Sequence, residues 1–286
     1  MDIVNKIVVK LKRCLLPTTY RFIPVGYGIN CQKRTETIVI SLTTYSARLP
    51  YVDLCIKSLL RQSLKPDKII LYLGEDVLLE NIPNNLRELK KNGLTIIGNC
   101  ENLRSHKKYF WALQQYKNSC VITVDDDAIY DRNLVKDLYF KHKKFPSAIV
   151  ARTVKKIEND KDGNLKSYRK WKFIRDKNFD SPRMDLVAVG VGGVLYPPDI
   201  LPPNTFNSQI IRDKAFKADD IWLKFAELES DVGVVFSWSP YFVPIAIERH
   251  QKEGLFATNV LSDENDVVIS NMQNLTQIYL KDFVIE

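Results

Sequence analysis

The stretch CVITVDDDAIY at residues 120–130 joins an apolar run directly to three consecutive carboxylates. Residues 121–124 are apolar or β-branched, which is typical of a buried strand in a parallel sheet. Asp125, Asp126 and Asp127 follow at the end of that strand, where each ionised carboxylate makes its neighbours harder to keep charged. This stretch alone leaves two interpretations open. The aspartates are either oxygen ligands for a divalent cation or a solvated acidic turn that caps the next helix.

The composition is that of an ordinary globular protein of 286 residues, with 45% apolar and 27% charged side chains. A chain of this length can bury a substantial core, in one large domain or two small ones. The formal net charge of +8 indicates an anionic partner, such as a nucleic acid, a phosphorylated ligand or a membrane surface. The basic residues are spread along the chain and form no dense block, which argues against nucleic acid.

Five scattered cysteines, odd in number and without a C-x-x-C pair, indicate a reducing compartment. They argue against both a disulfide framework and a structural zinc site. No apolar stretch approaches the ~20 residues needed to span a bilayer, and no signal peptide with a cleavage site is recognisable. We therefore expect a cytoplasmic protein.

From Thr37 onward, strand patterns alternate with helix patterns. Strands are predicted at 38–42, 68–73, 94–97 and 120–124, and helices at 50–63, 84–92 and 105–116. This alternation predicts an α/β fold with a mainly parallel central sheet and helices on both faces. Ligands of such sheets bind beyond the carboxyl ends of the strands, where the polar loop 43–48 and the three aspartates would both lie. No glycine-rich phosphate loop is present, which argues against a dinucleotide enzyme or a P-loop kinase.

The second half of the chain is less regular. Short strands are predicted at 148–151 and 232–236, and the segment 187–196 carries glycines at 190, 192 and 193. These glycines either let the backbone approach a ligand closely or mark a bulge in a core strand. The stretch KADDIWLKF at 217–225 predicts the start of a helix with Asp219 or Asp220 near its N-terminus, and a final helix is predicted from about Val267.

The first segment, residues 2–16, has the periodicity of an amphipathic helix with basic residues opposite its apolar face. This helix either packs on the protein's own core or lies in the plane of a membrane and meets anionic lipid. Residues 18–34 are rich in proline, glycine and tyrosine, which predicts a linker or a wrapping loop.

Four motifs follow one another in order: Thr-Thr-Tyr from Thr43, the three aspartates, Gly-Val-Gly-Gly from Gly190, and Ala-Asp-Asp-Ile-Trp from Ala218. This ordered set resembles the GT-A-fold glycosyltransferases, in particular family 2-like enzymes of bacterial surface-polysaccharide clusters, over residues 37–250. The resemblance implies one Rossmann-like GT-A domain at 36–250, with a nucleotide-binding half (36–130) and an acceptor-binding half (131–250). Residues 1–35 would form the amphipathic helix and a linker, and residues 251–286 a helical tail.

By this resemblance the three aspartates form an Asp-x-Asp motif. Asp125 would face the nucleotide and contribute to the metal site, and Asp127 would bind the Mg²⁺ or Mn²⁺ that bridges the diphosphate. Asp126 would share the metal or cap the following turn. The remaining donor-side candidates are Thr43, Thr44 and Tyr45 for the base, Arg48, Arg104 and Lys107 for phosphates, and Gly192 and Gly193 for the donor sugar. Tyr45 is otherwise an ordinary half-buried tyrosine, and the basic cluster 104–108 is otherwise a solvated helix face.

The pair Asp219-Asp220 matches the acidic pair that opens the acceptor-facing helix in this family. Asp220 is the candidate general base and Asp219 the helix cap, with the reverse assignment left open. Trp222 is either a platform under a sugar ring or a core residue. His250 stands where a late histidine completes the metal shell in several such enzymes, and is otherwise structural or on the surface.

The function implied by the resemblance is metal-dependent, inverting sugar transfer. The donor would be a nucleoside diphosphate sugar, with a UDP-sugar first among the candidates, and the acceptor a hydroxyl of a lipid-linked, lipopolysaccharide or capsule glycan. The basic charge and the N-terminal segment suit an enzyme at the inner membrane face. Two alternatives stay open: a nucleotidyltransferase with carboxylates on Mg²⁺, and a non-catalytic module that binds nucleotide-sugars or polyanions.

Overall fold

The computed structural model describes residues 18–239, 244–247 and 263–285. They fold around a seven-stranded sheet with the order β11-β6-β10-β4-β1-β2-β3, in which β10 runs antiparallel to both of its neighbours. The strands are β1 (Thr37–Thr44), β2 (Lys68–Gly74), β3 (Leu94–Cys100), β4 (Ser119–Thr123), β6 (Ile149–Ala151), β10 (Val194–Tyr196) and β11 (Val234–Phe236). The predicted α/β fold with a mainly parallel sheet is therefore confirmed.

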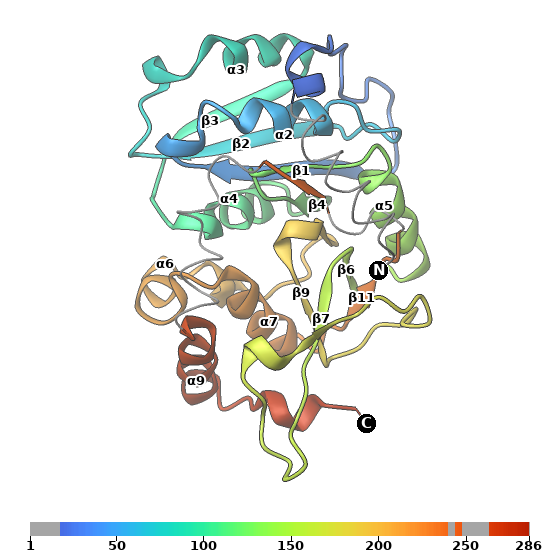
Figure 1. Cartoon of the computed structure of the whole chain (residues 1–286), viewed down its shortest axis with the longest axis vertical. Coiled ribbons are helices and arrows are strands. Elements are labelled where there is room, and N and C mark those ends of the chain that lie inside the picture. Colours follow the sequence, from blue (N-terminus) through green and yellow to red (C-terminus); the bar gives the residue numbers. More distant parts are fainter. Residues whose placement is uncertain (1–17, 240–243, 248–262, 286) are drawn as a thin grey trace.

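The alternation of β1 explains how the layers are built. Ile38 and Ile40 pack with the apolar residues of α2 (Val52–Leu59), whereas Val39 packs with Ala112 of α4 (Lys107–Gln115). Successive strand residues point to opposite faces, so a strand that is apolar throughout needs helices on both sides. Accordingly, α2 and α3 (Asn84–Glu88) lie on one side of the sheet and α4 on the other (Figure 1).

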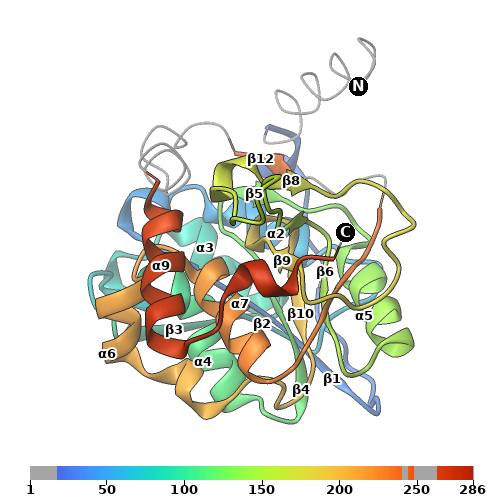
Figure 2. The same ribbon diagram turned by 90° about the horizontal axis from the view of Figure 1, so that it is seen from below.

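A second apolar cluster lies beyond β4. It is built around α7 (Asp219–Glu229), and α9 (Glu264–Thr276) lies alongside α7 (Figure 2). The final helix, predicted from about Val267, is confirmed and begins slightly earlier. The other elements of this part are α6 (Ser208–Ile210) and the three-stranded sheet of β8 (Lys172–Phe173), β7 (Val154–Lys156) and β9 (Leu186–Ala188). The helix α5 (Leu134–Lys144) also follows β4 in the sequence, but its buried apolar residues belong to the first cluster.

The segment 187–196 is not one core strand with a bulge. β9 ends at Ala188, a 3₁₀ turn spans Gly190–Gly192, and β10 begins at Val194 in the other sheet. Gly193 has φ +89°, a left-handed conformation that favours glycine. Because Val194 pairs with Thr123 in antiparallel register, the glycine turn comes to lie beside the residues that follow β4.

The two ends of the chain complete the described structure. Residues 18–34 wrap over the helices, since Arg61 and Lys65 donate to the carbonyls of Pro24 and Tyr27. Near the other end, β12 (Ile245–Ala246) pairs with β5 (Ala128–Ile129). The amphipathic helix expected at 2–16 lies outside the described residues. No helix in the described part combines the length and hydropathy needed to cross a bilayer.

Candidate active site

The carboxyl ends of β1 and β4 bring the first two motifs into contact. The two strands pair in parallel, and Thr44 at the end of β1 donates its Oγ1 hydrogen to Asp126 Oδ2 at 2.5 Å. Arg48 lies 2.5 Å from Asp126 Oδ1 through Nη1 and 3.0 Å from Asp127 Oδ2 through Nη2. Two segments about 80 residues apart in the sequence thus form one site.

The three aspartates differ in what they contact. Asp126 is buried, and its two oxygens are bound by Thr44 and Arg48. These contacts tie Asp126 to the loop after β1, and its expected role in sharing the metal or capping the next turn stays a prediction. Asp125 and Asp127 keep side chains that are 30% and 25% exposed. They are therefore the two members of the motif that are more open to a ligand.

Electrostatics favour a cation at these two carboxylates. Burial raises the pKa of Asp127 to about 6, with Asp125 adding to this rise and Arg48 opposing it. Burial also raises the pKa of Asp126, against the effect of Arg48. A hard divalent cation with oxygen ligands would relieve the repulsion between consecutive carboxylates. The donor set fits Mg²⁺ or Mn²⁺.

The loop after β1 is held by contacts within the protein. Thr43 Oγ1 donates to the carbonyl of Tyr72 in β2 at 2.8 Å. The guanidinium of Arg48 lies 5.3 Å from the ring centre of Tyr45, a half-buried side chain. Since Arg48 also contacts Asp126 and Asp127, it couples the loop to the aspartates.

The basic cluster that precedes β4 is not a solvated helix face. Lys107 and Lys108 are both buried, and only Arg104 is exposed, with its guanidinium 4.8 Å from the ring centre of Phe216. Lys107 Nζ donates to Asn102 Oδ1 at 2.9 Å. Lys108 is the member that reaches the acids.

Lys108 connects the aspartate motif to the acidic pair of α7. Its Nζ lies 2.8 Å from Asp125 Oδ1 and forms an ion pair with Asp219 Oδ2 at 2.7 Å. Despite burial, these carboxylates raise the pKa of Lys108 well above its usual value. One ammonium therefore bridges two acids that lie 94 residues apart in the sequence.

Asp219 and Asp220 have different partners although they are adjacent. Asp219 accepts a hydrogen bond from Ser105 Oγ at 2.8 Å and makes no capping bond, since the N-cap position is Ala218. Burial opposes its ionisation, but Lys108 outweighs burial and the pKa of Asp219 falls to about 2. Asp220 Oδ1 accepts the backbone N–H of Gly190 at 3.1 Å. Burial, reinforced by Asp219, raises the pKa of Asp220 well above its usual value.

Gly190 is the glycine that approaches the acids. A Cβ atom at this position would lie 2.7 Å from Lys108 Nζ and 3.2 Å from Asp220 Oδ1. The glycines expected at the donor sugar, Gly192 and Gly193, have other neighbours: an added Cβ would collide with Thr153 and Leu134, respectively. Of the glycine segment 190–193, Gly190 is therefore the residue whose backbone lies closest to the acids.

Two further candidates from the sequence do not join the described site. Trp222 is only 5% exposed and its Nε1 donates to the carbonyl of Thr205 at 3.1 Å within the second apolar cluster. It is a core residue, so the interpretation as a sugar platform is wrong, because a buried ring offers no face to a sugar. His250 lies outside the described residues.

Lys155 and Tyr130 also border the site, and neither was predicted. Lys155 Nζ donates to the carbonyl of Tyr168, and burial lowers its pKa to about 8 although Asp220 opposes this change. Tyr130 Oη accepts the backbone N–H of Asp125 and donates to the carbonyl of Val191, both at 3.0 Å. The bond from Tyr130 to Val191 joins segments 61 residues apart, and the burial of Lys155 depends on tertiary packing, so no local sequence pattern marks either residue.

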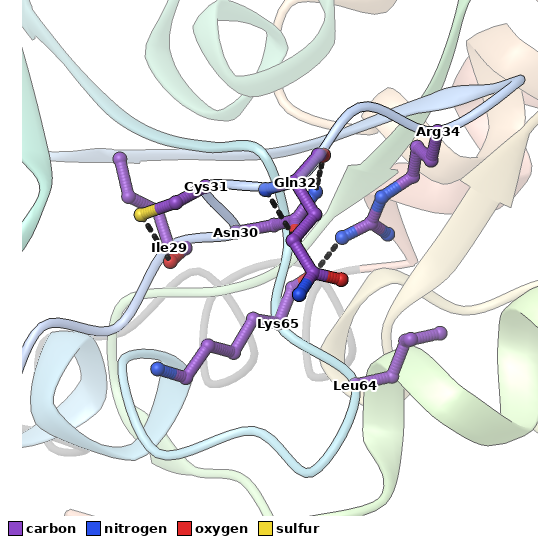
Figure 3. A pocket seen from close by; sticks show the side chains of 7 residues that line it. All are labelled: Ile29, Asn30, Cys31, Gln32, Arg34, Leu64 and Lys65. Atoms are coloured by element: carbon purple, nitrogen blue, oxygen red, sulfur yellow. Dashed lines mark hydrogen bonds between the residues drawn. The ribbon is translucent and has the colours of Figure 1, made fainter.

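Two other features lie away from the acids. A pocket of about 350 Å³ is drawn in Figure 3, where Arg34 donates to the carbonyl of Lys65. A second group of possible metal ligands, Glu36, Cys120 and His142, lies at the opposite end of β4, with ligand atoms within 4.8 Å of one another. Glu36 already accepts from the side chains of Tyr139 and Lys143. This group does not replace Asp125 and Asp127 as candidate metal ligands.

A family model described as glycosyl transferase family 2 matches residues 39–193, more than half of the chain. The chain belongs to glycosyl transferase family 2. The matched part of this family 2 chain includes the loop 43–48, the three aspartates, Lys108 and the glycine turn. Asp219 and Asp220 follow the matched part. Their place in the candidate site therefore rests on their contacts with Lys108 and Gly190, which lie within it.

Three solved structures are similar to this family 2 chain at low identity. One is a mannosyltransferase from Pyrobaculum calidifontis in complex with GDP-Man and Mn²⁺, with 12% identity, coverage of 95% of this chain and 84% of that chain, and a TM-score of 0.47. The second is a 4-diphosphocytidyl-2C-methyl-D-erythritol synthase from Anaerococcus prevotii, with 16% identity, coverage of 79% of this chain and 96% of that chain, and a TM-score of 0.47. The third is a CMP:2-keto-3-deoxy-manno-octonic acid synthetase complexed with CTP, with 12% identity, coverage of 72% of this chain and 90% of that chain, and a TM-score of 0.42. No curated protein sequence matches. The family assignment therefore rests on the family model.

Proposed function

We propose that the protein transfers a sugar from a nucleoside diphosphate donor to a hydroxyl acceptor with the help of a divalent cation. The observation that carries this proposal is that the acids after β4 and the acids at the start of α7 both contact the ammonium of Lys108. Asp125 of the strand-end motif and Asp219 of the helix-start pair both contact Lys108. A module that only binds nucleotide-sugars has no need for a second acidic pair beside the first.

The donor side is the end of β4. Asp127 and Asp125 are the residues proposed to hold Mg²⁺ or Mn²⁺, which would supply positive charge to the leaving diphosphate. Tyr45 and Arg48, stacked on each other beside these carboxylates, are proposed to contact the nucleotide. Which sugar the donor carries is an open part of this proposal, with a UDP-sugar tested first.

The acceptor side is the start of α7. Asp220 is proposed to take the proton of the acceptor hydroxyl. As it does so, the acceptor oxygen bonds to the anomeric carbon of the donor sugar, and the bond from that carbon to the diphosphate oxygen breaks. This single displacement inverts the anomeric centre. The raised pKa of Asp220 suits a general base, and the backbone N–H of Gly190 fixes its orientation. Asp219 stays charged and serves as a structural partner of Lys108 and Ser105.

The acceptor is proposed to be a lipid-linked or lipopolysaccharide glycan at an anionic membrane surface. The net charge of +8 and the amphipathic pattern of residues 2–16 support this location. Removal of residues 1–17 should reduce sedimentation of the protein with anionic vesicles. Unchanged sedimentation would contradict the membrane part of the proposal and leave the transfer reaction untouched.

A panel of nucleotide-sugars tests the reaction itself. The protein is incubated with UDP-, GDP- and dTDP-sugars and Mn²⁺, and release of the nucleoside diphosphate is measured with and without glycan acceptors. Release from at least one donor is expected. Pyrophosphate release from a nucleoside triphosphate and a sugar phosphate would instead indicate a nucleotidyltransferase, and binding without turnover would indicate a binding module.

A further inference from the structure

The donor-side and acceptor-side acids are held together by the ammonium of Lys108. Its Nζ lies 2.8 Å from Asp125 Oδ1 and 2.7 Å from Asp219 Oδ2, and the side chain is only 5% exposed. Asp220 lies close to the same ammonium. A Cβ atom built on Gly190 would be 2.7 Å from Lys108 Nζ, 3.2 Å from Asp220 Oδ1 and 3.5 Å from Asp125 Oδ1. Three carboxylates thus surround one ammonium, and without it they would repel one another across the site.

The position of this ammonium is fixed from several directions. The Lys108 backbone carbonyl accepts the Ser41 hydroxyl of β1 at 2.5 Å, which pins the residue to the central sheet. Gly190 lies against Nζ so closely that even a methyl group would be 2.7 Å away. Lys108 therefore has little freedom to turn toward a substrate phosphate while it holds both carboxylates.

Each acid around Lys108 has a distinct second contact. Asp219 accepts from Ser105, whereas Asp220 accepts from the backbone of Gly190. Asp125 is held at its backbone by Tyr130. Because Lys108 links Asp125 to Asp219, it also sets the distance between the strand end and the start of the helix that carries Asp220.

We propose that Lys108 is a positioning residue that ties the donor-side Asp125 to the acceptor-side Asp219 and thereby aligns Asp220 with the reacting carbon of the donor. This inference rests on the proposed glycosyl transfer and assigns to Lys108 no contact with the substrate. Its loss should therefore slow transfer more than it weakens donor binding.

The test compares wild type with Lys108→Met, Asp219→Asn and the double variant. Lys108→Met keeps the length and apolar stem of the side chain but removes its charge. We expect kcat for nucleoside diphosphate release to fall by about 100-fold, the loss that misplacement of a catalytic group can cause. The affinity for UDP or GDP with Mn²⁺, measured by titration calorimetry, should stay close to that of wild type.

The double variant gives the sharper readout. In Lys108→Met the Asp219 charge is buried and unpaired, so Asp219→Asn in that background should recover about tenfold in kcat, a coupling typical of contacting charges. The melting temperature should follow the same pattern, falling in Lys108→Met and recovering in the double variant.

Lys224→Met is the matched control. It removes a buried lysine of α7 that pairs with Glu227 of the same helix and contacts no site acid. It should lower the melting temperature without a comparable loss of kcat.

Several results would overturn the inference. Wild-type kcat in Lys108→Met would show that alignment does not depend on the ammonium. Equal losses in kcat and nucleotide affinity would show that Lys108 binds the donor directly. Strictly additive effects would show that Lys108 and Asp219 act separately. If wild type releases no nucleoside diphosphate, the proposed function fails, and the melting-temperature cycle still decides whether Lys108 couples to Asp219.

Discussion

Asp219 and Asp220 are neighbours in the sequence, yet their surroundings give them different chemistry. Lys108 and Ser105 keep Asp219 charged, whereas Asp220 has a backbone N–H as its hydrogen-bond donor and a raised pKa. Pairs of acids whose environments push their pKa values apart are typical of acid–base sites. Distinct roles for the two residues follow from these contacts.

Asp220→Asn should therefore abolish transfer and spare donor binding. A general base contributes about 10²- to 10⁴-fold in rate, so a loss of that size in kcat is expected in a nucleoside diphosphate release assay. The Asn side chain can still accept the Gly190 N–H, which should preserve the local fold and the affinity for nucleotide with Mn²⁺. A variant that keeps the wild-type rate would reject Asp220 as the base.

His106 makes stability depend on pH. Its ring is fully buried between the Tyr109 hydroxyl and the Ala215 carbonyl, and burial lowers its pKa from 6.5 to about 4. In the unfolded chain the imidazole of His106 takes up a proton below pH 6.5, whereas in the folded protein it does so only near pH 4. The folded protein is therefore most favoured by this residue above pH 6.5, and this part of the free energy of unfolding is lost as the pH falls from 6.5 to 4. The shift corresponds to about 3 kcal/mol.

This linkage is measured by urea unfolding at several pH values between 7 and 4. The free energy of unfolding of wild type should fall more steeply over this range than that of His106→Gln, which retains polar groups but has no titrating ring. Parallel curves for the two proteins would contradict a buried neutral His106.

At the scale of elements, the glycine turn is the part of the fold on which the site depends most. Gly190→Ala would place a methyl group 2.7 Å from Lys108 Nζ and 3.2 Å from Asp220 Oδ1. We expect this variant to lose most of its kcat, because the added methyl group would displace the Lys108 ammonium from the acids. It should keep a cooperative melting transition, because no core side chain has to move. Gly26→Ala is the control, since nothing lies within 4 Å of its added Cβ; equal activity of both variants would contradict the account.

The elements themselves could be predicted because their signals are local. The apolar runs of β1 and β4 occur where the sequence pattern placed them, and the helical segment predicted at 84–92 ends at Gly93, which has φ +112°. The choice between Lys107 and Lys108 could not be made in this way. It depends on how α4 lies against β1, although Lys108 stands four residues before the sheet-facing Ala112, a spacing that marks the same helix face.

Other features of the site were hidden for the same reason. The break of segment 187–196 into two strands depends on the pairing of Val194 with Thr123, a partner 71 residues away. Burial of Asp126 depends on Thr44 and Arg48 from another strand end. Contacts of this kind leave no periodicity in the sequence, so a common site was indicated only by the position of the motifs after predicted parallel strands and by their order along the chain.

At the scale of the whole molecule, one sheet runs through both halves of the chain. β6, β10 and β11 from the later half extend the sheet formed by β1 to β4, and β10 pairs directly with β4. We therefore expect residues 36–250 to unfold in one cooperative step. Urea transitions followed by far-UV circular dichroism and by fluorescence of buried tryptophans such as Trp222 should coincide; separate midpoints would show that the halves are independent units.

The central claim is that the carboxylates after β4 hold the cation that a nucleotide-sugar needs. Nucleoside diphosphate release, measured against Mn²⁺ concentration for wild type and Asp127→Asn, tests it most directly. The account predicts that release by wild type rises with Mn²⁺ and is abolished by EDTA, and that Asp127→Asn shows no release above background. Full release by Asp127→Asn, or by wild type in EDTA, would contradict it.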